Sequence, residues 1–291
     1  MNATSVNNAA FNMVRGLDRN QELLGRSLSR LGSGNRILNP SDDPTGVGHA
    51  AKLESQSRRN QAASINVQNA ISHLQASDGM LETMASAVTR LSEIATRALD
   101  PNLNTEERAL YQQEFSILQQ QLRDTVGGST AEIGGPSDVT DPIGRFNGRD
   151  LFGAGSGLQV NLGIFAEQSL NLLPTNLRTG GFASLIAQDA SGAFLLSIDD
   201  AAAVATTGAA LEQLGDHRAS LGAVQSRLEF VAEALTVESE NLGSALSRIS
   251  DADVASETTQ LTRYNLIADS SNSMIAQANQ APASVIRLLQ S

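Results

Sequence analysis

The sequence predicts a mainly α-helical fold, a long antiparallel coiled-coil bundle of N- and C-terminal segments with a small β-rich hairpin region in the middle. One of two heptad repeats lies in the first third of the chain. Its apolar and small residues alternate at spacings of four and three, at Ala63, Val67, Ala70, Leu74, Ser77, Leu81, Met84, Val88, Leu91, Ala95 and Ala98. A 3.5-residue repeat keeps one seam of a helix facing its partner, so this spacing is typical of helices that wind around one another.

The second repeat lies near the C-terminus and has the same spacing. Its members are Ala210, Leu214, His217, Leu221, Val224, Leu228, Val231, Leu235, Glu238, Leu242, Ala245 and Ile249. Aromatic residues make up only 3% of the chain and Trp is absent, whereas a large compact core usually relies on such rings. We therefore expect the two repeats to pack together around a thin aliphatic core.

The N-terminal helices are bounded by turn residues. An apolar stripe at Val14, Leu17, Gln21, Leu24, Leu28 and Leu31 predicts a first helix that ends at Gly32-Ser33-Gly34. The segment 39–44 (NPSDDP) then supplies prolines and acidic residues that favour a helix N-terminus. We expect a second helix from this point to about Leu99.

The remaining elements follow from shorter signals. Asp100-Pro101 stops the second helix, and Asn104 with Glu107 has the spacing of a capping box that opens a third. The third helix is expected to bury Tyr111, Phe115, Leu118 and Leu122, and the Gly- and Pro-rich stretch 127–146 is expected to be a loop. Alternation around 158–162 and 170–172 predicts a hairpin within a β element at about 150–195. Helices are expected from Ala201 to Ile249 and from about Leu261 to Leu289.

Charge and composition exclude several functions. The net charge is −11, whereas nucleic-acid or anionic-lipid binding requires a basic surface. Without Cys the chain has no disulfides or thiolate metal sites. It also lacks an apolar run long enough to span a membrane and the apolar region of a secretory signal. We expect no nucleic-acid partner, no membrane insertion and no cleaved signal peptide.

No catalytic or metal-binding arrangement stands out. Histidines occur only at 49, 73 and 217, without helical ligand spacing, and His217 is interpreted as a tolerated polar seam residue. The pairs Asp42-Asp43 and Asp199-Asp200 precede predicted helices, so a favourable interaction with the helix dipole explains them better than acid-base catalysis. We expect a non-enzyme without a cofactor or a metal.

The terminal stripes point to assembly. A lone amphipathic helix is marginal in water, so these apolar faces need partners, either each other or neighbouring copies. Candidate polymerisation residues are Val14, Leu17, Leu24, Leu28, Leu31, Leu261, Ile275, Val285, Leu288 and Leu289. Our hypothesis is that the ends are disordered in the monomer and fold as subunits join, so that ordering and polymerisation are coupled.

Five separated strings resemble the signatures of bacterial flagellin, the flagellar filament subunit. They are SRLGSGNRILNPSDDP (29–44), FNGRDLF (146–152), SLGAVQSRLEF (220–230), NLGSALSRISDAD (241–253) and ANQAPASVIRLLQS (278–291). They occur in the family's order and cover roughly the first 150 and the last 85 residues. Only about 70 residues separate the second string from the third, so the chain resembles a minimal flagellin without large outer-surface domains.

The resemblance implies a subunit that polymerises into a filament for motility. Residues 1–42 and 252–291 correspond to an inner-core domain of terminal helices, and residues 43–251 to an outer-core helical bundle. It also implies secretion through the flagellar type III apparatus. The implied partners are other flagellin subunits, hook-associated junction and cap proteins, and a flagellar export chaperone.

The resemblance further suggests a surface for the flagellin-sensing Toll-like receptor. Arg90 and Glu114 match its charged contact positions, and Ile94 stands where Leu is usual. An ordinary solvated helix face is the alternative, since neighbours such as Ser92 depart from the pattern.

Two alternatives to the filament subunit stay open. The segment NPSDDP also resembles the hook-filament junction protein of the same family, although the C-terminal strings are closer to flagellin. A soluble coiled-coil scaffold would share the heptads but would not need apolar stripes that reach the last residues. The stretch from Gly127 to Arg145 is longer than the connection usual in flagellins.

Overall fold

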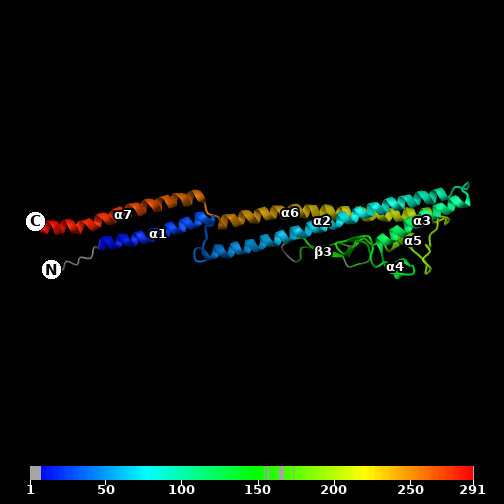
Figure 1. Ribbon diagram of the computed structural model, residues 1–291, viewed down its shortest axis with the longest axis horizontal. Coiled ribbons are helices and arrows are strands. Elements are labelled where there is room, and N and C mark those ends of the chain that lie inside the picture. Colours follow the sequence, from blue (N-terminus) through cyan, green and yellow to red (C-terminus); the bar gives the residue numbers. More distant parts are fainter. Residues whose placement is uncertain (1–7, 154, 156, 164–166, 173, 291) are drawn as a thin grey trace. The chain divides into compact units, whose positions relative to one another are not determined.

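The predicted helical fold with short hairpins is confirmed by the structure (Figure 1). The computed structural model describes residues 8–153, 155, 157–163, 167–172 and 174–290, without the side chains of 8–10, 278–279 and 281–290. The helices are α1 (Asn8–Ser33), α2 (Pro44–Ala98), α3 (Thr105–Val126), α4 (Thr130–Ile133), α5 (Gly180–Ile186), α6 (Ala203–Ser250) and α7 (Val254–Gln290). The strands are β1 (Arg145–Phe146), β2 (Arg149–Asp150), β3 (Leu158–Asn161) and β4 (Ser169–Leu172).

The chain divides into two compact units. One, here called the terminal unit, comprises Met1–Arg58 and Ser239–Ser291. The other, the central unit, comprises Arg59–Glu238. The boundaries fall inside α2 and α6, so each of these long helices contributes to both units.

The first heptad repeat forms the spine of the central unit. All eleven of its residues, from Ala63 to Ala98, are buried. The second repeat supplies Ala210, Leu214, Leu228 and Leu235 to the same cores, and its remaining members within the central unit are partly buried. Coiled-coil packing between α2 and α6 is therefore confirmed. The Arg218 guanidinium of α6 donates two hydrogen bonds to the Asp78 carboxylate of α2, at 2.8 and 3.2 Å.

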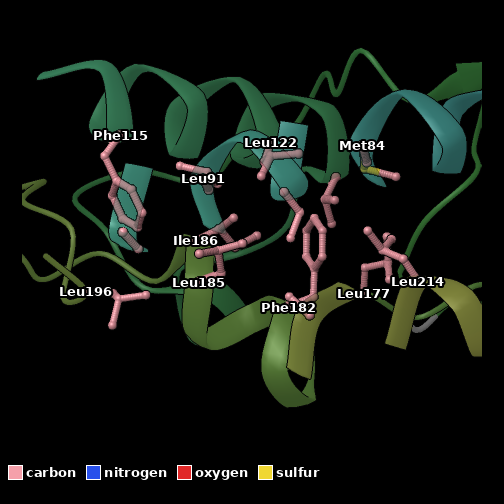
Figure 2. Packing of buried hydrophobic residues seen from close by; sticks show 14 of the residues in the cluster. Met84, Leu91, Phe115, Leu122, Leu177, Phe182, Leu185, Ile186, Leu196 and Leu214 are labelled. Carbon is pink, nitrogen blue, oxygen red and sulfur yellow. The ribbon is translucent and has the colours of Figure 1, made fainter. Parts of the chain in front are cut away.

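A larger core lies where α3 and α5 join this helix pair. Figure 2 shows Phe182 of α5 extending toward Leu122 of α3, with Met84 of α2 and Leu214 of α6 beside them. The predicted apolar face of α3 is confirmed, because Phe115 and Leu122 are buried while Tyr111 and Leu118 pack against the same core. The predicted capping box is also present, with the Glu107 N–H donating to Asn104 Oδ1 and the Asn104 N–H to Glu107 Oε2.

The predicted hairpin is confirmed at β3 and β4, which pair antiparallel with Leu158 opposite Leu172. Val160 and Leu172 face a second core formed with α2 and α6. A smaller hairpin joins β1 to β2, where Asn147 adopts a positive φ of 50°. An Asn-Gly pair tolerates this left-handed backbone, which explains the tight turn before the β region predicted to begin at about 150.

Two short helices were not expected. The stretch 127–146 contains the single turn α4, and the region expected to be β-rich contains α5. Arg123 of α3 joins them. Its guanidinium donates to the carbonyl oxygens of Ile133 at the end of α4 and of Gly134 just after it, at 2.7 and 2.6 Å, and to that of Ile186 in α5 at 3.3 Å. The prediction of a loop therefore missed α4, because the carbonyl groups at its end are bound by the Arg123 side chain of α3.

The terminal unit consists of α1 and α7 lying side by side, together with the adjoining ends of α2 and α6 (Figure 1). The predicted end of α1 at Gly32-Ser33-Gly34 is confirmed, with Gly34 at a φ of 72°. Antiparallel pairing of Asn35 with Asp251 joins the two connections between helices.

Candidate assembly surfaces

The contact between α1 and α7 has a polar centre. Asn20, Ser27 and Glu257 are only 5%, 1% and 9% exposed, and no apolar side chain of the described part of the terminal unit is buried to this degree. The Asn20 side-chain amide donates to the Tyr264 carbonyl oxygen at 2.7 Å. The Ser27 hydroxyl donates to the Glu257 carbonyl oxygen at 3.3 Å. Polar groups that face a helix seam in this way restrict how the two helices can pair.

Several of the predicted polymerisation residues lie in this seam. Leu17, Leu24 and Leu31 are partly buried and keep heptad spacing with Asn20 and Ser27. Leu261 and Ile275 of α7 are also partly buried. The structure therefore brings these five together along one helix pair.

The apolar stripe predicted for α1 lies only partly in the α1–α7 seam. The expected stripe included Val14, Gln21 and Leu28, but all three are exposed, and the seam contains Met13, Asn20 and Ser27 one position earlier. Both heptads share Leu17, Leu24 and Leu31, so apolar spacing alone could not separate them. The hydrogen bonds of Asn20 and Ser27 to α7 carbonyl groups, which spacing does not reveal, favour the less apolar seam.

As a result, α1 and α7 present apolar side chains away from their common seam. On α1, Val14 and Leu28 are 41% and 51% exposed, and Phe11 and Leu23 are exposed as well. On α7 the exposed large apolar residues are Val254, Leu266, Ile267 and Met274. Val285, Leu288 and Leu289 continue the predicted stripe, but their side chains lie outside the described residues.

Where the helices break, Arg36 links the two connections of the terminal unit. Its guanidinium donates to the Ile249 carbonyl oxygen at 2.8 and 3.2 Å, and its backbone N–H donates to the Ser250 carbonyl oxygen at 2.7 Å. Arg36 also lies 3.6 Å from the carboxylate of Asp43, which accepts a hydrogen bond from the Gly46 N–H in the first turn of α2. Arg36 therefore caps the end of α6 and pairs with the residue that caps α2, a role that sequence reasoning missed.

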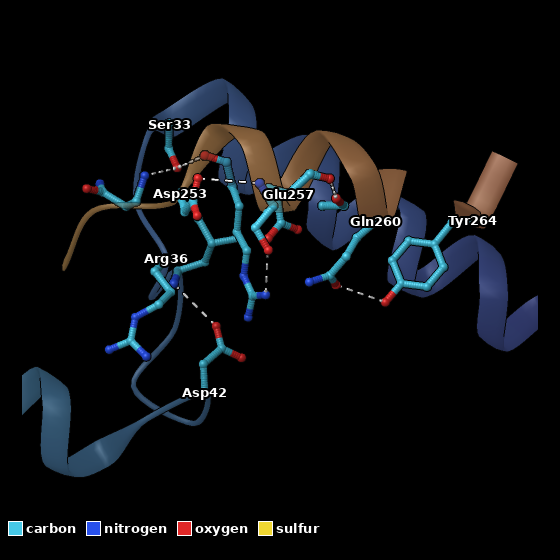
Figure 3. A network of polar contacts seen from close by, with 12 residues as sticks. Ser33, Arg36, Asp42, Asp253, Glu257, Gln260 and Tyr264 are labelled. Atoms are coloured by element: carbon cyan, nitrogen blue, oxygen red, sulfur yellow. Dashed lines mark hydrogen bonds and ion pairs between the residues drawn. The ribbon is translucent and has the colours of Figure 1, made fainter. Parts of the chain in front are cut away.

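Beside Arg36, acidic residues hold the surrounding turns (Figure 3). Asp42 accepts from the N–H groups of Asn39 and Leu38 at 3.1 and 3.3 Å, and chiefly the Asn39 bond lowers the pKa of its carboxyl group. Asp253 accepts from the Ala255 N–H at 3.0 Å at the start of α7. The Asp42-Asp43 pair therefore supports a turn and a helix N-terminus, which agrees with the structural interpretation of this pair.

The second acidic pair behaves differently. Asp199 forms an ion pair with Arg108 at 2.8 Å, and the Asp200 carboxylate accepts from the Ser197 N–H at 2.9 Å. The Asp200 backbone carbonyl, rather than its side chain, accepts from the Ala203 N–H at the start of α6. The Asp199 carboxylate therefore pairs with Arg108 and the Asp200 carboxylate holds a turn, instead of capping the helix as expected.

The candidate receptor surface contains an ion-paired cluster. Arg90 of α2 lies 2.7 Å from Glu114 of α3 and 3.1 Å from Glu93, and the Arg90 and Glu114 side chains are about two-fifths exposed. Hydrogen bonding to Glu114, followed by that to Glu93, raises the pKa of Arg90. Ile94 is 0% exposed and belongs to the core, so its assignment to this surface is wrong. Heptad position explains the error, since Leu91 and Ala95 beside it already mark the buried face.

The described residues contain no group of His, Asp and Glu side chains that could hold a metal ion. His73 packs edge-on against Phe146 with ring centroids 5.9 Å apart, and burial, followed by the nearby charge of Arg149, lowers its pKa. His217 is partly buried in the α6 seam, as expected. Among the helices described, none has a stretch both long and apolar enough to cross a bilayer.

Comparison with known proteins gives matches at both ends of the chain. Residues 4–132 match the bacterial flagellin N-terminal helical region, and residues 204–289 match the bacterial flagellin C-terminal helical region. A flagellin of Bacillus subtilis strain 168 is 31% identical over 98% of each chain. A flagellar filament 33 kDa core protein of Treponema phagedenis is 31% identical over 91% of this chain and 92% of its own. A flagellin of Halalkalibacterium halodurans is 30% identical over 97% and 96%.

Proposed function

Since the chain belongs to the bacterial flagellin family and is a non-enzymatic structural subunit of the extracellular flagellar filament, we propose that its terminal helices fold and bury their outward apolar faces as it polymerises. Polymerisation with other flagellin subunits follows from the family. The proposal concerns the residues that drive it, namely the predicted terminal set, with Val14 and Leu28 facing other subunits and Leu17, Leu24, Leu31, Leu261 and Ile275 facing the α1–α7 seam.

The composition of the terminal unit supports this proposal. Its most buried side chains are polar, while Phe11, Val14 and Leu28 of α1 and Leu266 of α7 remain exposed. Full burial of such a side chain contributes about 1.5 to 3 kcal/mol, whereas fixing one residue's backbone costs about 1 to 2 kcal/mol. A helix pair that leaves its large apolar groups in water gains little with which to offset that cost, so neighbouring subunits supply the missing contacts.

Circular dichroism of monomer and filament tests the coupling of folding to assembly. We expect the helical signal per residue to rise when monomers elongate purified filament seeds, because α1 and α7 order only then. Equal helicity in both states would contradict the proposal. Elongation without a rise in helicity would show that folding of the ends is not coupled to assembly.

Deletion of residues 278–291 separates a filament subunit from a scaffold. The shortened chain should keep the thermal unfolding transition of the central unit, because that unit lies at 59–238. It should no longer elongate seeds. Normal elongation would remove the C-terminal stripe, including Val285, Leu288 and Leu289, from the proposed assembly surface.

We propose that functional domains meet at the helix breaks rather than at the borders of the compact units. Residues 1–42 and 252–291 would form the inner core, and 43–251 the outer core with its β element at about 150–195. The turns near Asn39 and Asp251, tied by Arg36, support this division because each helix changes direction or ends there.

Before assembly, the exposed faces of α1 and α7 would need protection. We propose a flagellar export chaperone that covers these apolar faces, followed by secretion through the type III apparatus, with hook-associated junction and cap proteins meeting the same faces at the filament ends. Unprotected apolar faces of this kind favour association. Co-purification of a chaperone with the full chain, lost on deletion of 278–291, would support this order.

A second function concerns the Arg90–Glu114 cluster. We propose that the flagellin-sensing Toll-like receptor contacts Arg90 and Glu114, whose side chains remain accessible although they pair with each other. In a receptor reporter assay, Arg90→Ala should reduce signalling, whereas the exposed control Arg97→Ala should not. Unchanged signalling by Arg90→Ala, or no signal from the unsubstituted protein, would exclude this surface.

A further inference from the structure

A hollow of about 720 Å³, here called the hairpin groove, lies between α2, the β1–β2 hairpin and β3 of the central unit. This volume is within the range of small-ligand sites. Figure 1 shows β3 beside α2, and Val160 of β3 packs in the same core as Ala70 of α2. The walls of the groove are therefore held by the core beneath it. The polar and aromatic side chains on its α2 and β1–β2 walls include Asn66, Asn69, His73, Phe146, Asn147 and Arg149.

Three amides of the groove have no partner in the protein. Asn66 and Asn69 lie one turn apart on one side of α2, and Asn147 lies at the turn of the β1–β2 hairpin. None of their side chains forms a hydrogen bond within the described part of the chain. In contrast, Gln159 and Asn161 on the β3 wall each have a partner in the β3–β4 hairpin. A carboxamide both donates and accepts hydrogen bonds, so the three amides suit hydroxyl groups, which also do both.

Arg149 gives the groove a cation without a carboxylate. Arg145 and Arg178, which line an adjoining hollow, each form an ion pair with an acidic side chain. Arg149 lines both hollows, but it forms no ion pair or hydrogen bond with any residue that the structure describes. Burial first, and then the charge of Arg149, lower the pKa of His73. The guanidinium of Arg149 is therefore free to bind a carboxylate through two parallel hydrogen bonds.

Phe146 adds an apolar surface to the same groove. It is 36% exposed, and its ring meets that of His73 edge-on with centroids 5.9 Å apart. A sugar ring presents apolar C–H groups beside its hydroxyl groups, so one ligand can contact the Phe146 ring, the amides and the guanidinium together. The net charge of the chain is −11, which opposes general attraction of anions. An anion held in the groove therefore depends on these local contacts.

From these contacts we propose that the hairpin groove binds an acidic saccharide. Arg149 pairs with the carboxylate of a sugar acid, and Phe146 packs against the sugar ring. Asn66, Asn69 and Asn147 bond the hydroxyl groups. Because the groove belongs to the central unit, this binding is separate from the assembly of the terminal helices.

Calorimetric titration of the unpolymerised full chain with tetragalacturonate tests the proposal. The fully methyl-esterified tetrasaccharide should bind at least about tenfold more weakly, because it has no carboxylate to pair with Arg149. Arg149→Gln should weaken tetragalacturonate binding by about tenfold, and Arg149→Lys by less, since lysine keeps the charge without the planar fork. The matched control is Arg227→Gln, at an exposed α6 position outside the groove, which should leave the affinity within about twofold.

Two further variants test the contacts to the sugar itself. Asn69→Ala removes an amide from an exposed position and should weaken binding by about threefold, through one lost hydrogen bond. Phe146→Leu keeps an apolar side chain but removes the ring, and should also weaken binding by about threefold. Thermal unfolding of both variants checks that the central unit stays folded.

Three results would overturn the proposal. The first is the absence of tetragalacturonate binding at about 10 mM. The second is an equal loss of affinity with Arg149→Gln and Arg227→Gln, which would show that only overall charge matters. The third is binding of hexaglutamate as tight as that of tetragalacturonate, which would assign the groove to an acidic peptide. Elongation of filament seeds is measured separately, so failure here leaves the proposed function untouched.

Discussion

Arg123 places a cation among carbonyl oxygens rather than carboxylates. Its side chain is 2% exposed, and it donates to three carbonyl groups at the ends of α4 and α5. Burial lowers its pKa, with the charge of Asp124 opposing that effect. The carbonyl dipoles at helix C-termini stabilise a positive charge, which explains how the core accommodates one.

Arg123→Met should therefore destabilise the central unit by about 3 kcal/mol, since three buried acceptors lose a charged donor. Denaturant unfolding followed by circular dichroism measures the change. The exposed ion pair of Arg108 with Asp199 provides the control, and Arg108→Met should cost less than about 1 kcal/mol. Equal effects of the two substitutions would show that the carbonyl contacts of Arg123 contribute nothing beyond an ordinary surface charge.

Glu132 makes stability depend on pH. Its carboxylate accepts from the Ser129 N–H at 3.0 Å and lies 3.1 Å from Arg178, and chiefly the Ser129 bond lowers its pKa below the ordinary value of 4.5. Because the folded pKa is the lower one, its stabilisation is complete above 4.5 and is lost as the pH falls through the folded value. Glu132→Gln should cost about 1 kcal/mol at pH 7.

Urea unfolding of both proteins at several pH values tests this dependence. The stability difference should be constant from pH 7 to about 5 and should narrow at lower pH. A difference that widens on acidification would reverse the sign of the effect and exclude a lowered pKa as its origin.

At the scale of elements, the capping box of α3 acts locally and should behave additively. Asn104→Ala should destabilise the central unit by about 1 kcal/mol, because the Glu107 N–H loses its acceptor at 2.8 Å. Asn102→Ala is the matched control, since Asn102 contacts Asp100 before the helix begins. Thermal unfolding compares them, and a control that costs as much as Asn104→Ala would count against capping.

Elements defined by local or strictly periodic signals were predictable. The heptad from Ala63 to Ala98 and the Asn104–Glu107 box needed no knowledge of distant residues. Helix α5 could not be predicted without knowledge of distant residues, because it opens with Gly180 and Gly181, both poor helix formers, and spans only seven residues. Its apolar side chains enter the core, and the Phe182 N–H donates to Gln213 Oε1 of α6 at 3.0 Å. Tertiary contacts therefore decide this helix.

The sequence indicated which helices carry the candidate assembly surface, but not which side of α1 faces α7. The terminal stripe lies on α1 and α7, yet Val14 and Leu28 face away from α7 while Asn20 and Ser27 face it. Apolar periodicity indicates which side of a helix can bury surface. It does not show which of two overlapping seams has hydrogen-bond acceptors on the facing helix. Ile94 is a different case, because the family likeness placed it on a surface although the neighbouring heptad positions Leu91 and Ala95 mark its face as buried.

Across the whole molecule, the two units differ in what stabilises them. All of the fully buried apolar side chains in the described structure belong to the central unit, from Ala63 to Leu235. In the described part of the terminal unit the most deeply buried side chains are polar, the seam leucines are only partly buried, and several large apolar side chains stay exposed. The central unit therefore has the core of an independent domain, and the terminal unit depends on contacts with other copies for comparable burial.

This difference predicts that Leu28→Gln affects the filament more than the subunit. Leu28 is 51% exposed, so the change should alter the unfolding free energy of the monomer by less than about 0.5 kcal/mol. If a neighbouring subunit buries this side chain, about 2 kcal/mol of burial is lost per contact, and the critical concentration for elongation should rise about 30-fold. Sedimentation of filaments at a series of subunit concentrations gives this value.

The control is Arg19→Gln, at another exposed α1 position without an apolar side chain, which should leave the critical concentration within about twofold. An unchanged critical concentration for Leu28→Gln would mean that Leu28 stays in water after assembly, and the burial argument for polymerisation would then have to rest on the other outward apolar residues of α1 and on α7.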